Sequence, residues 1–238
     1  TGDPNLHTHV VIANKVQGPD GAWRSVDSRA PHHAAVAVSE LYDDLFADHL
    51  AARLTVRWGW RSRGQRRTPA YELDGIDDRL LSAFSSRSVQ VDAAMREALV
   101  DFHAAHGRGP TRVEVLRLRQ QATRATRPAK TPHPLVDLLA RWREQAQRLT
   151  GRSPATVASG AIRGGDRPLR AADISGETAR RLADFALQQV MVRRAVWTPW
   201  NAFTEAARVT RGLRMASTDD RLALVDRVGA AVLAGSMR

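Results

Sequence analysis

Asp3-Pro4-Asn5-Leu6-His7-Thr8-His9, followed by Val10-Val11-Ile12-Ala13-Asn14, is the most informative stretch of the chain. Proline steers the residue before it away from the helical region, so Asp3-Pro4 predicts an extended or turning entry. The apolar run that follows carries no helix signal. We therefore expect His7 and His9 on one strand, where residues i and i+2 share a face. Two imidazoles would then converge, which is the arrangement that a divalent metal needs from neighbouring ligands.

The His-x-His spacing alone does not establish a metal site, because two ordinary histidines near a strand end show the same pattern. Two imidazoles leave a metal mostly hydrated, whereas catalytic zinc sites usually supply three protein ligands. We therefore expect His7 and His9 to bind Mg²⁺, Mn²⁺ or Zn²⁺ weakly unless a further side chain joins them. The candidates for this third ligand are Asp3, Asp27, His32 and His33.

The composition predicts a folded chain with a polyanionic partner. Hydrophobic residues make up 43% of the 238 residues, which is enough for a core. The net charge of +11 favours nucleic acid. Only Lys15 and Lys130 among the 36 basic residues are lysine, so coding bias is a second explanation for the many arginines. The chain has no cysteine, no signal-peptide pattern and no apolar run of about 18 residues, and we expect a cytoplasmic protein without a membrane span.

Two hairpins are predicted in the first third of the chain. Gly18-Pro19-Asp20-Gly21 is a turn signal, so residues 7–27 are expected to form the first hairpin. In residues 55–61, large apolar side chains alternate with arginine and glycine. An arginine-rich loop and a short strand at 70–73 follow, so we predict a second hairpin here. Arginines beside tryptophans suit single-stranded nucleic acid, although the tryptophans could equally face the core. The candidate DNA contacts on these hairpins are Trp23, Arg24, Arg57, Trp58, Trp60, Arg61, Arg63, Arg66 and Arg67.

Helical periodicity begins at residue 34. The apolar stripe of residues 34–54 includes Leu41, Tyr42 and Phe46, and it predicts a packed core position for Tyr42. Shorter helical patterns follow at 76–84 and 85–103, then an arginine-rich helix capped by Thr111 and a helix at 135–149. The arginine-rich helix could lie on a phosphate backbone or present a solvated face.

Asp-Pro-x-Leu-His-Thr-His with the apolar run after it closely resembles the histidine motif of the TrwC/TraI-type (MobF) conjugative relaxases, and Phe84-Ser85-x-Arg87 resembles a further element of that family. The resemblance implies an antiparallel sheet flanked by helices, and strand-specific nicking of single-stranded DNA at a transfer origin. It implies that His7 and His9 hold a divalent metal and that Arg87 contacts DNA. The family's third histidine and nucleophilic tyrosines match no residue here, so the resemblance implies a C-terminal part of a relaxase domain that works with an upstream relaxase portion or other conjugation proteins.

The predicted organisation is α+β: residues 1–149 are the relaxase part, 150–172 a linker, and 173–238 a small all-helical module. Ser175, Thr198 and either Ser217 or Thr218 are expected to cap the module's helices. Its Trp-Thr-x-Trp-Asn segment resembles the region joining relaxase to helicase in the family, and no Walker motif accompanies it. Two functions remain open, an active relaxase fragment and an accessory or remnant protein that binds DNA without chemistry. No residue of the chain is predicted to act as the nucleophile.

Overall fold

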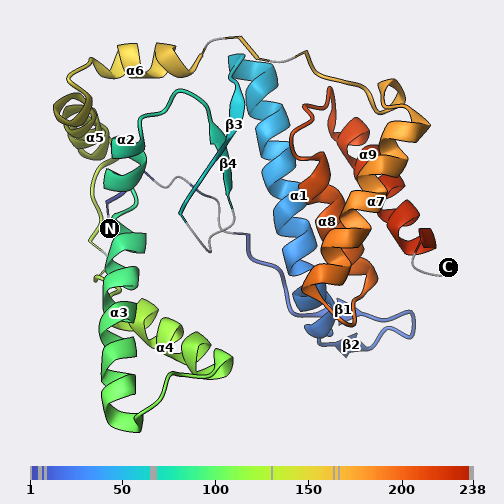
Figure 1. The fold of residues 1–238 in the computed structure, drawn as a ribbon, viewed down its shortest axis with the longest axis horizontal. Coiled ribbons are helices and arrows are strands. Elements are labelled where there is room, and N and C mark those ends of the chain that lie inside the picture. The colour runs from blue at the N-terminus through green and yellow to red at the C-terminus, as the bar shows by residue number, and fades with distance from the viewer. Residues whose placement is uncertain are drawn as a thin grey trace. The chain divides into compact units, whose positions relative to one another are not determined.

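The computed structural model describes residues 2–4, 7, 10–64, 69–129, 131–162, 164–165 and 167–235. The chain forms two compact units, whose elements are labelled in Figure 1. The first unit consists of residues 1–9 and 75–160, and the second of residues 10–74 and 161–238. The larger part of the first unit, residues 75–160, is therefore inserted in sequence between the two halves of the second.

The second unit combines two hairpins with four long helices. Strands β1 (Val16–Gln17) and β2 (Trp23–Arg24) pair antiparallel, as do β3 (Trp58–Arg61) and β4 (Ala70–Leu73). In the second pair Trp60 lies opposite Tyr71 and Gly59 opposite Glu72. The helical elements of this unit are α1 (Arg29–Leu54), a 3-10 turn (Ala171–Asp173), α7 (Gly176–Arg193), α8 (Pro199–Thr210) and α9 (Thr218–Gly235).

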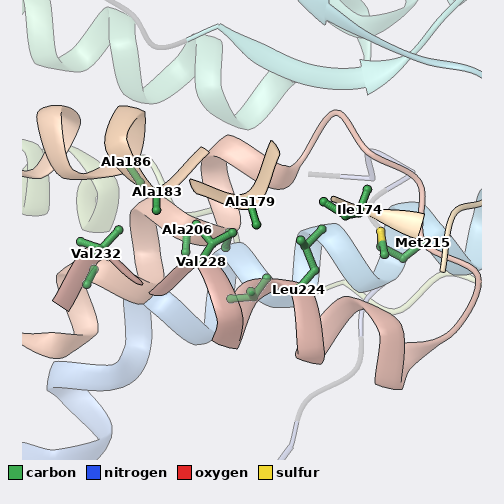
Figure 2. Close-up of a cluster of buried hydrophobic side chains, with 12 residues drawn as sticks. Ile174, Ala179, Ala183, Ala186, Ala206, Met215, Leu224, Val228 and Val232 are labelled. Atoms are coloured by element: carbon green, nitrogen blue, oxygen red, sulfur yellow. The ribbon is translucent and has the colours of Figure 1, made fainter. Parts of the chain in front are cut away.

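The main hydrophobic core lies between α7, α8 and α9, and Figure 2 shows its side chains meeting between these helices. Small residues such as Ala186 and Ala206 let the helices approach closely, while Leu224 and Val228 fill the space between them. Gly229 marks the tightest approach, because a Cβ there would lie 2.7 Å from the Phe203 ring. The predicted caps are confirmed for Ser175 and Ser217, whose hydroxyls accept from Thr178 N and Asp220 N at 3.1 Å each. Thr198 occupies the N-cap position of α8, but its hydroxyl accepts no backbone hydrogen bond there.

The most buried face of α1 is not its apolar stripe, although Leu41 of that stripe packs partly buried against the core. Asp44 is fully buried and Asp48 nearly so, with Ala37, Ala47 and Ala51 beside them. Tyr42 is 65% exposed, so its predicted place in the core is wrong. The physical reason is the surface against which α1 packs. This surface, formed by α8, the turn after it and the start of α9, carries arginines, and a buried arginine requires a carboxylate partner.

Seven side chains form the ion-pair cluster that fastens α1 to this surface. Arg221 donates two hydrogen bonds to Asp48, from Nε to Oδ2 at 2.7 Å and from Nη2 to Oδ1 at 2.9 Å. Arg211 Nε donates to Asp44 Oδ1 at 2.7 Å, and its Nη2 donates to Glu40 Oε2 at 2.6 Å. The cluster comprises Glu40, Asp44, Asp48, Arg208, Arg211, Arg214 and Arg221.

The first unit is helical in its described residues. It contains α2 (Asp78–Ala83), α3 (Ser86–His106), α4 (Arg112–Ala125), α5 (Leu135–Thr150) and α6 (Pro154–Ala161), whose last residue belongs to the second unit. The Asp77 carboxylate accepts from Arg79 N at the start of α2. Thr111 and Glu114 form the capping box of α4, which confirms the predicted cap. Helix α6 lies within the predicted linker at 150–172, and the functional boundaries at 149 and 172 stay predictions.

The α+β prediction with a helical C-terminal part is confirmed, whereas one strand prediction is wrong. His7 and residues 10–15 are not in a strand, and β1 begins only at Val16. Val10, Val11 and Ile12 are 79–93% exposed, so the apolar alternation that indicated a strand meets no packing surface among the described residues. None of the described helices is long and apolar enough to span a membrane.

Candidate nucleic-acid interface

The predicted histidine pair falls mostly outside the part of the chain that the structure describes. His7 is exposed and lies in an irregular segment, while His9 is outside the described residues. Their convergence on one face therefore stays a prediction. Among the described residues, no group of three histidine, aspartate or glutamate side chains is arranged to hold a metal ion.

The residues proposed to complete the metal site have other neighbours. Asp3 accepts hydrogen bonds from the Ser86 hydroxyl at 2.8 and 2.7 Å and from Arg87 N at 3.4 Å, so its carboxylate lies at the N-terminus of α3. A carboxylate at this end of a helix is favoured by the unpaired amides and the helix dipole. Asp27 forms an ion pair with Arg29 at 3.1 Å, and this hydrogen bond lowers its pKa. His32 and His33 lie in the first turn of α1 and are exposed.

The first hairpin presents one of the candidate aromatic side chains to solvent. Trp23 is 66% exposed on β2. Its neighbour Arg24 donates to Asp20 through both terminal nitrogens, at 2.7 and 2.5 Å. This hydrogen-bonded pair lowers the pKa of Asp20 to about 2. Arg24 is therefore hydrogen-bonded to its own turn, and the DNA contacts of Trp23 and Arg24 stay predictions.

The second hairpin divides its tryptophans between two environments. Trp58 is half-buried and stacks on Tyr71 with ring centroids 5.8 Å apart, while Phe46 meets it edge-on at 6.3 Å. Trp60 is 56% exposed and tilts against Tyr71 at 4.9 Å. The two tryptophans lie on the same face of the hairpin, since both contact Tyr71, but they differ in exposure. Trp58 is packed between Phe46 and Tyr71, whereas more than half of the Trp60 side chain is exposed to solvent.

The arginines of this hairpin also differ from one another. Arg61 pairs with Glu72 across the strands, at 2.6 Å through Nε and 2.9 Å through Nη2. This ion pair runs diagonally across the two strands, whose register places Trp60 opposite Tyr71. Arg57 and Arg63 are exposed on the strand ends, while Arg66 and Arg67 lie outside the described residues.

Arg87 holds the helices of the first unit together. Its Nη1 donates to the Thr126 carbonyl at 2.5 Å and to the Thr126 hydroxyl at 2.8 Å, and its Nη2 donates to the Thr123 carbonyl. A guanidinium at the carbonyl end of a helix satisfies groups that have no partner within the helix. The predicted DNA contact of Arg87 stays a prediction, and its observed role is to cap α4.

The sequence interpretation missed two parts of the arrangement. Tyr71 completes the aromatic cluster, and the cross-strand pairing Trp60↔Tyr71 was available from the spacing of the predicted hairpin. The ion-pair cluster was not accessible in this way, because its carboxylates and guanidiniums are separated by about 170 residues, as in the pairs Asp48–Arg221 and Asp44–Arg211.

The comparisons with known proteins identify the family. The model of the TrwC relaxase family matches residues 1–149, which is more than half of the chain. No match was found among curated proteins or among solved structures. The matched region includes the histidine motif, both hairpins, α1, α2, α3, α4 and all but the last residue of α5. This chain belongs to the TrwC relaxase family, which supports a relaxase-type function in DNA nicking.

Proposed function

We propose that this chain binds single-stranded DNA at a transfer origin, as the DNA-holding part of a relaxase that nicks one strand. The observation that carries the proposal is the hairpin of β3 and β4, where Trp60 presents an exposed ring braced by Tyr71. A base of any identity can stack on such a ring, and this stacking contributes about 1–3 kcal/mol per base. Membership of the TrwC relaxase family supports single-stranded DNA as the ligand.

The charge of the chain supports the same ligand. The net charge of +11 attracts a phosphate backbone, and Arg57 and Arg63 are exposed at the ends of the strand that carries Trp60. Guanidinium groups bind phosphates through paired hydrogen bonds. Bases would meet the aromatic cluster while phosphates meet these arginines, together with Arg66 and Arg67.

The proposal is tested by the affinity of a labelled oligonucleotide of twelve thymidines, measured by fluorescence anisotropy at several salt concentrations. We expect Trp60→Ala to weaken binding about fivefold to a hundredfold, from the loss of one stacking contact. The matched control is Trp200→Ala, because Trp200 is 42% exposed but lies on α8. Affinity should also fall steeply with salt as counterions are released. Equal binding by wild type and Trp60→Ala would remove the hairpin from the interface.

Metal binding by His7 and His9 remains part of the proposal, because relaxases of this family use a divalent metal. The described residues do not supply a complete ligand set, so the contribution of the metal rests on these two imidazoles. Calorimetry with Mn²⁺ or Zn²⁺ should detect weak binding that His7→Ala abolishes. Submicromolar affinity would show that other side chains complete the site.

A second candidate function is DNA binding without strand transfer, and the position of Tyr71 favours it. The Tyr71 ring is packed against Trp58 and Trp60, and the guanidinium of Arg214 lies 5.3 Å from its centroid. These contacts indicate that Tyr71 packs the hairpin, and they do not favour its hydroxyl as a nucleophile that attacks phosphorus. Incubation of labelled origin DNA with Mg²⁺ or Mn²⁺, followed by denaturing electrophoresis, should show no covalent adduct. An adduct lost in Tyr71→Phe or Tyr42→Phe would identify an active relaxase.

A further inference from the structure

A pocket of about 680 Å³ opens beside the exposed ring of Trp60, entirely within the second unit. Its volume falls in the range of about 300–1,000 Å³ that is typical of small-molecule sites. One wall comes from the hairpin of β3 and β4, and another from α1. The remaining wall comes from α7 and α8, which lie beyond the region that the TrwC family model matches.

The α7 wall is a single helical stripe. Phe185, Gln189 and Arg193 line the pocket, and their i, i+4, i+8 spacing places them on one face of the helix. Phe185 is 53% exposed although it is a large apolar ring. The pocket therefore has aromatic side chains on two walls, Trp60 and Tyr71 on the hairpin and Phe185 on α7.

The polar groups of the pocket are fixed in place by ion pairs. Glu205 is 1% exposed and accepts from Arg193 at 3.0 Å and from Arg208 at 2.7 Å. Arg208 and Arg211 both reach Glu40, at 2.6 Å each. Because these side chains are already held by ion pairs, a ligand that binds here loses little free energy in ordering them.

The formal charges around the pocket cancel. Four carboxylates and four guanidiniums line it, namely Glu40, Asp43, Glu72 and Glu205 against Arg63, Arg193, Arg208 and Arg211. A phosphate would need an excess of positive charge, and an apolar group would leave these polar atoms desolvated. A neutral, planar molecule with donors and acceptors on its edge satisfies both conditions. A nucleobase is such a molecule.

We propose that this pocket receives one unpaired nucleobase of the bound strand, stacked between the hairpin aromatics and Phe185. The proposal rests on the single-stranded DNA binding proposed above and deepens it, because it makes α7 and α8 part of the DNA site. Proteins that read single-stranded nucleic acid commonly splay a base into such a site, stack it on aromatic rings and hydrogen-bond its edge.

Asp43 is the group best placed to read the edge of the base. Its side chain is 59% exposed, and its distance to the nearest nitrogen of Arg211 is 3.9 Å, longer than a hydrogen bond. A carboxylate accepts from the exocyclic amino group of cytosine. Uracil offers a ring N–H flanked by two carbonyl oxygens, which repel a carboxylate. We therefore expect the pocket to favour cytosine over uracil.

The position of the base can be tested by photocrosslinking. An oligonucleotide of twelve nucleotides containing 5-iododeoxycytidine is bound to the full chain and irradiated, and the crosslinked peptides are identified by mass spectrometry. We expect crosslinks to Trp60 and also to Phe185. The crosslink on α7 is the decisive one, because stacking on the hairpin alone would produce only the first.

Base reading is tested by comparing oligonucleotides of twelve deoxycytidines and twelve deoxyuridines. We expect the wild-type chain to prefer deoxycytidine about threefold to tenfold, as for one exposed charge-assisted hydrogen bond. Asp43→Asn should reduce this ratio toward one. Phe185→Ala should weaken the binding of both oligonucleotides and abolish the crosslink to α7. The matched control is Met191→Ala, because Met191 is 63% exposed on the same helix and does not line the pocket.

The outcomes separate the two proposals. Binding of both oligonucleotides with no crosslink to Phe185, or with a ratio unaffected by Asp43→Asn, would overturn the base pocket while leaving single-stranded DNA binding intact. A failure of the chain to bind either oligonucleotide at low salt would overturn both. The α7 crosslink together with a ratio reduced by Asp43→Asn supports the pocket.

Discussion

Asp44 shows how much a single buried carboxylate can determine in this molecule. It has no exposed surface, and burial raises its pKa to about 6 in spite of the hydrogen bond from Arg211. Its second oxygen, Oδ2, has no hydrogen-bond partner among the described residues and lies 4.0 Å from Arg221. The neighbouring Asp43 is largely exposed, so the two adjacent aspartates provide a matched pair.

We predict that Asp44→Ala lowers the free energy of unfolding of the second unit by about 3–5 kcal/mol, because removing one partner of a buried ion pair leaves uncompensated guanidiniums. Asp43→Ala should change it by no more than about 0.5 kcal/mol, as expected for a surface substitution. Urea denaturation of both variants, followed by tryptophan fluorescence, measures the difference. Equal effects at the two positions would contradict the structural importance of Asp44.

The raised pKa of Asp44 also predicts a dependence of stability on pH. Between its unfolded pKa of 3.8 and its folded pKa of about 6, the folded state binds the extra proton. The contribution of Asp44 is therefore most favourable below pH 3.8 and is lost as the pH rises to about 6, by roughly 3 kcal/mol at most. The pKa values of Asp20 and Asp77 are lowered to about 2, so these two carboxylates stabilise the fold above pH 3.8. Their contribution is lost as the pH falls toward 2.

The measurement is the free energy of unfolding at intervals from pH 4 to pH 7 for wild type and Asp44→Asn. The difference between the two profiles isolates Asp44, because the asparagine does not titrate. We expect the wild-type stability to fall relative to the variant across this range. Parallel profiles would mean that Asp44 stays ionised throughout.

At the scale of single elements, α1 shows where sequence patterns are sufficient and where they are not. Its helical character and approximate bounds follow from periodicity, and so does the pairing of β3 with β4. Which face of α1 is buried does not follow, because the helix carries an apolar stripe with Tyr42 and an acidic stripe with Asp44. The choice between the two stripes depends on Arg211, directly after α8, and Arg221 in α9, both far along the chain.

The candidate site follows the same division. The alternation of residues 55–61 placed Trp60 on the hairpin, and the structure shows it exposed there. The pocket beside it could not be predicted, because the sequence pattern of α7 has no feature that marks Phe185 as a pocket residue. Only the packing of α1, α7 and α8 brings that ring to the hairpin.

Helix α4 provides a prediction about capping. Thr111 Oγ1 accepts from Glu114 N, and the Glu114 carboxylate accepts from Thr111 N at 2.7 Å. We expect Thr111→Ala to reduce the opening free energy of the α4 amides by about 1 kcal/mol. Native-state hydrogen exchange measures it. Thr123→Ala is the control, because Thr123 lies in the last turn of the helix, away from the N-terminal cap, and its hydroxyl donates only to the carbonyl four residues before it. A larger loss in the control would contradict the assigned cap.

At the scale of the whole molecule, the two units are expected to open separately. The ion-pair cluster ties α1 to α8 and α9, whereas Val91 is buried in α3 of the first unit. We predict that Asp48→Ala reduces hydrogen-exchange protection in α1, α8 and α9 together and leaves α3 and α4 unchanged. Val91→Ala should give the reverse pattern. Loss of protection throughout the molecule in either variant would show that the units unfold as one.

The interruption of the second unit by the first has a consequence for biosynthesis. Asp48 is translated 173 residues before Arg221, its bidentate partner. At about 5–20 residues per second, α1 leaves the ribosome roughly ten to thirty seconds before its guanidinium partners exist. The helices of the first unit emerge during that interval and can fold early. Nascent α1 must meanwhile remain hydrated or be held by a chaperone, and a ribosomal pause between α6 and α7 would lengthen its exposure.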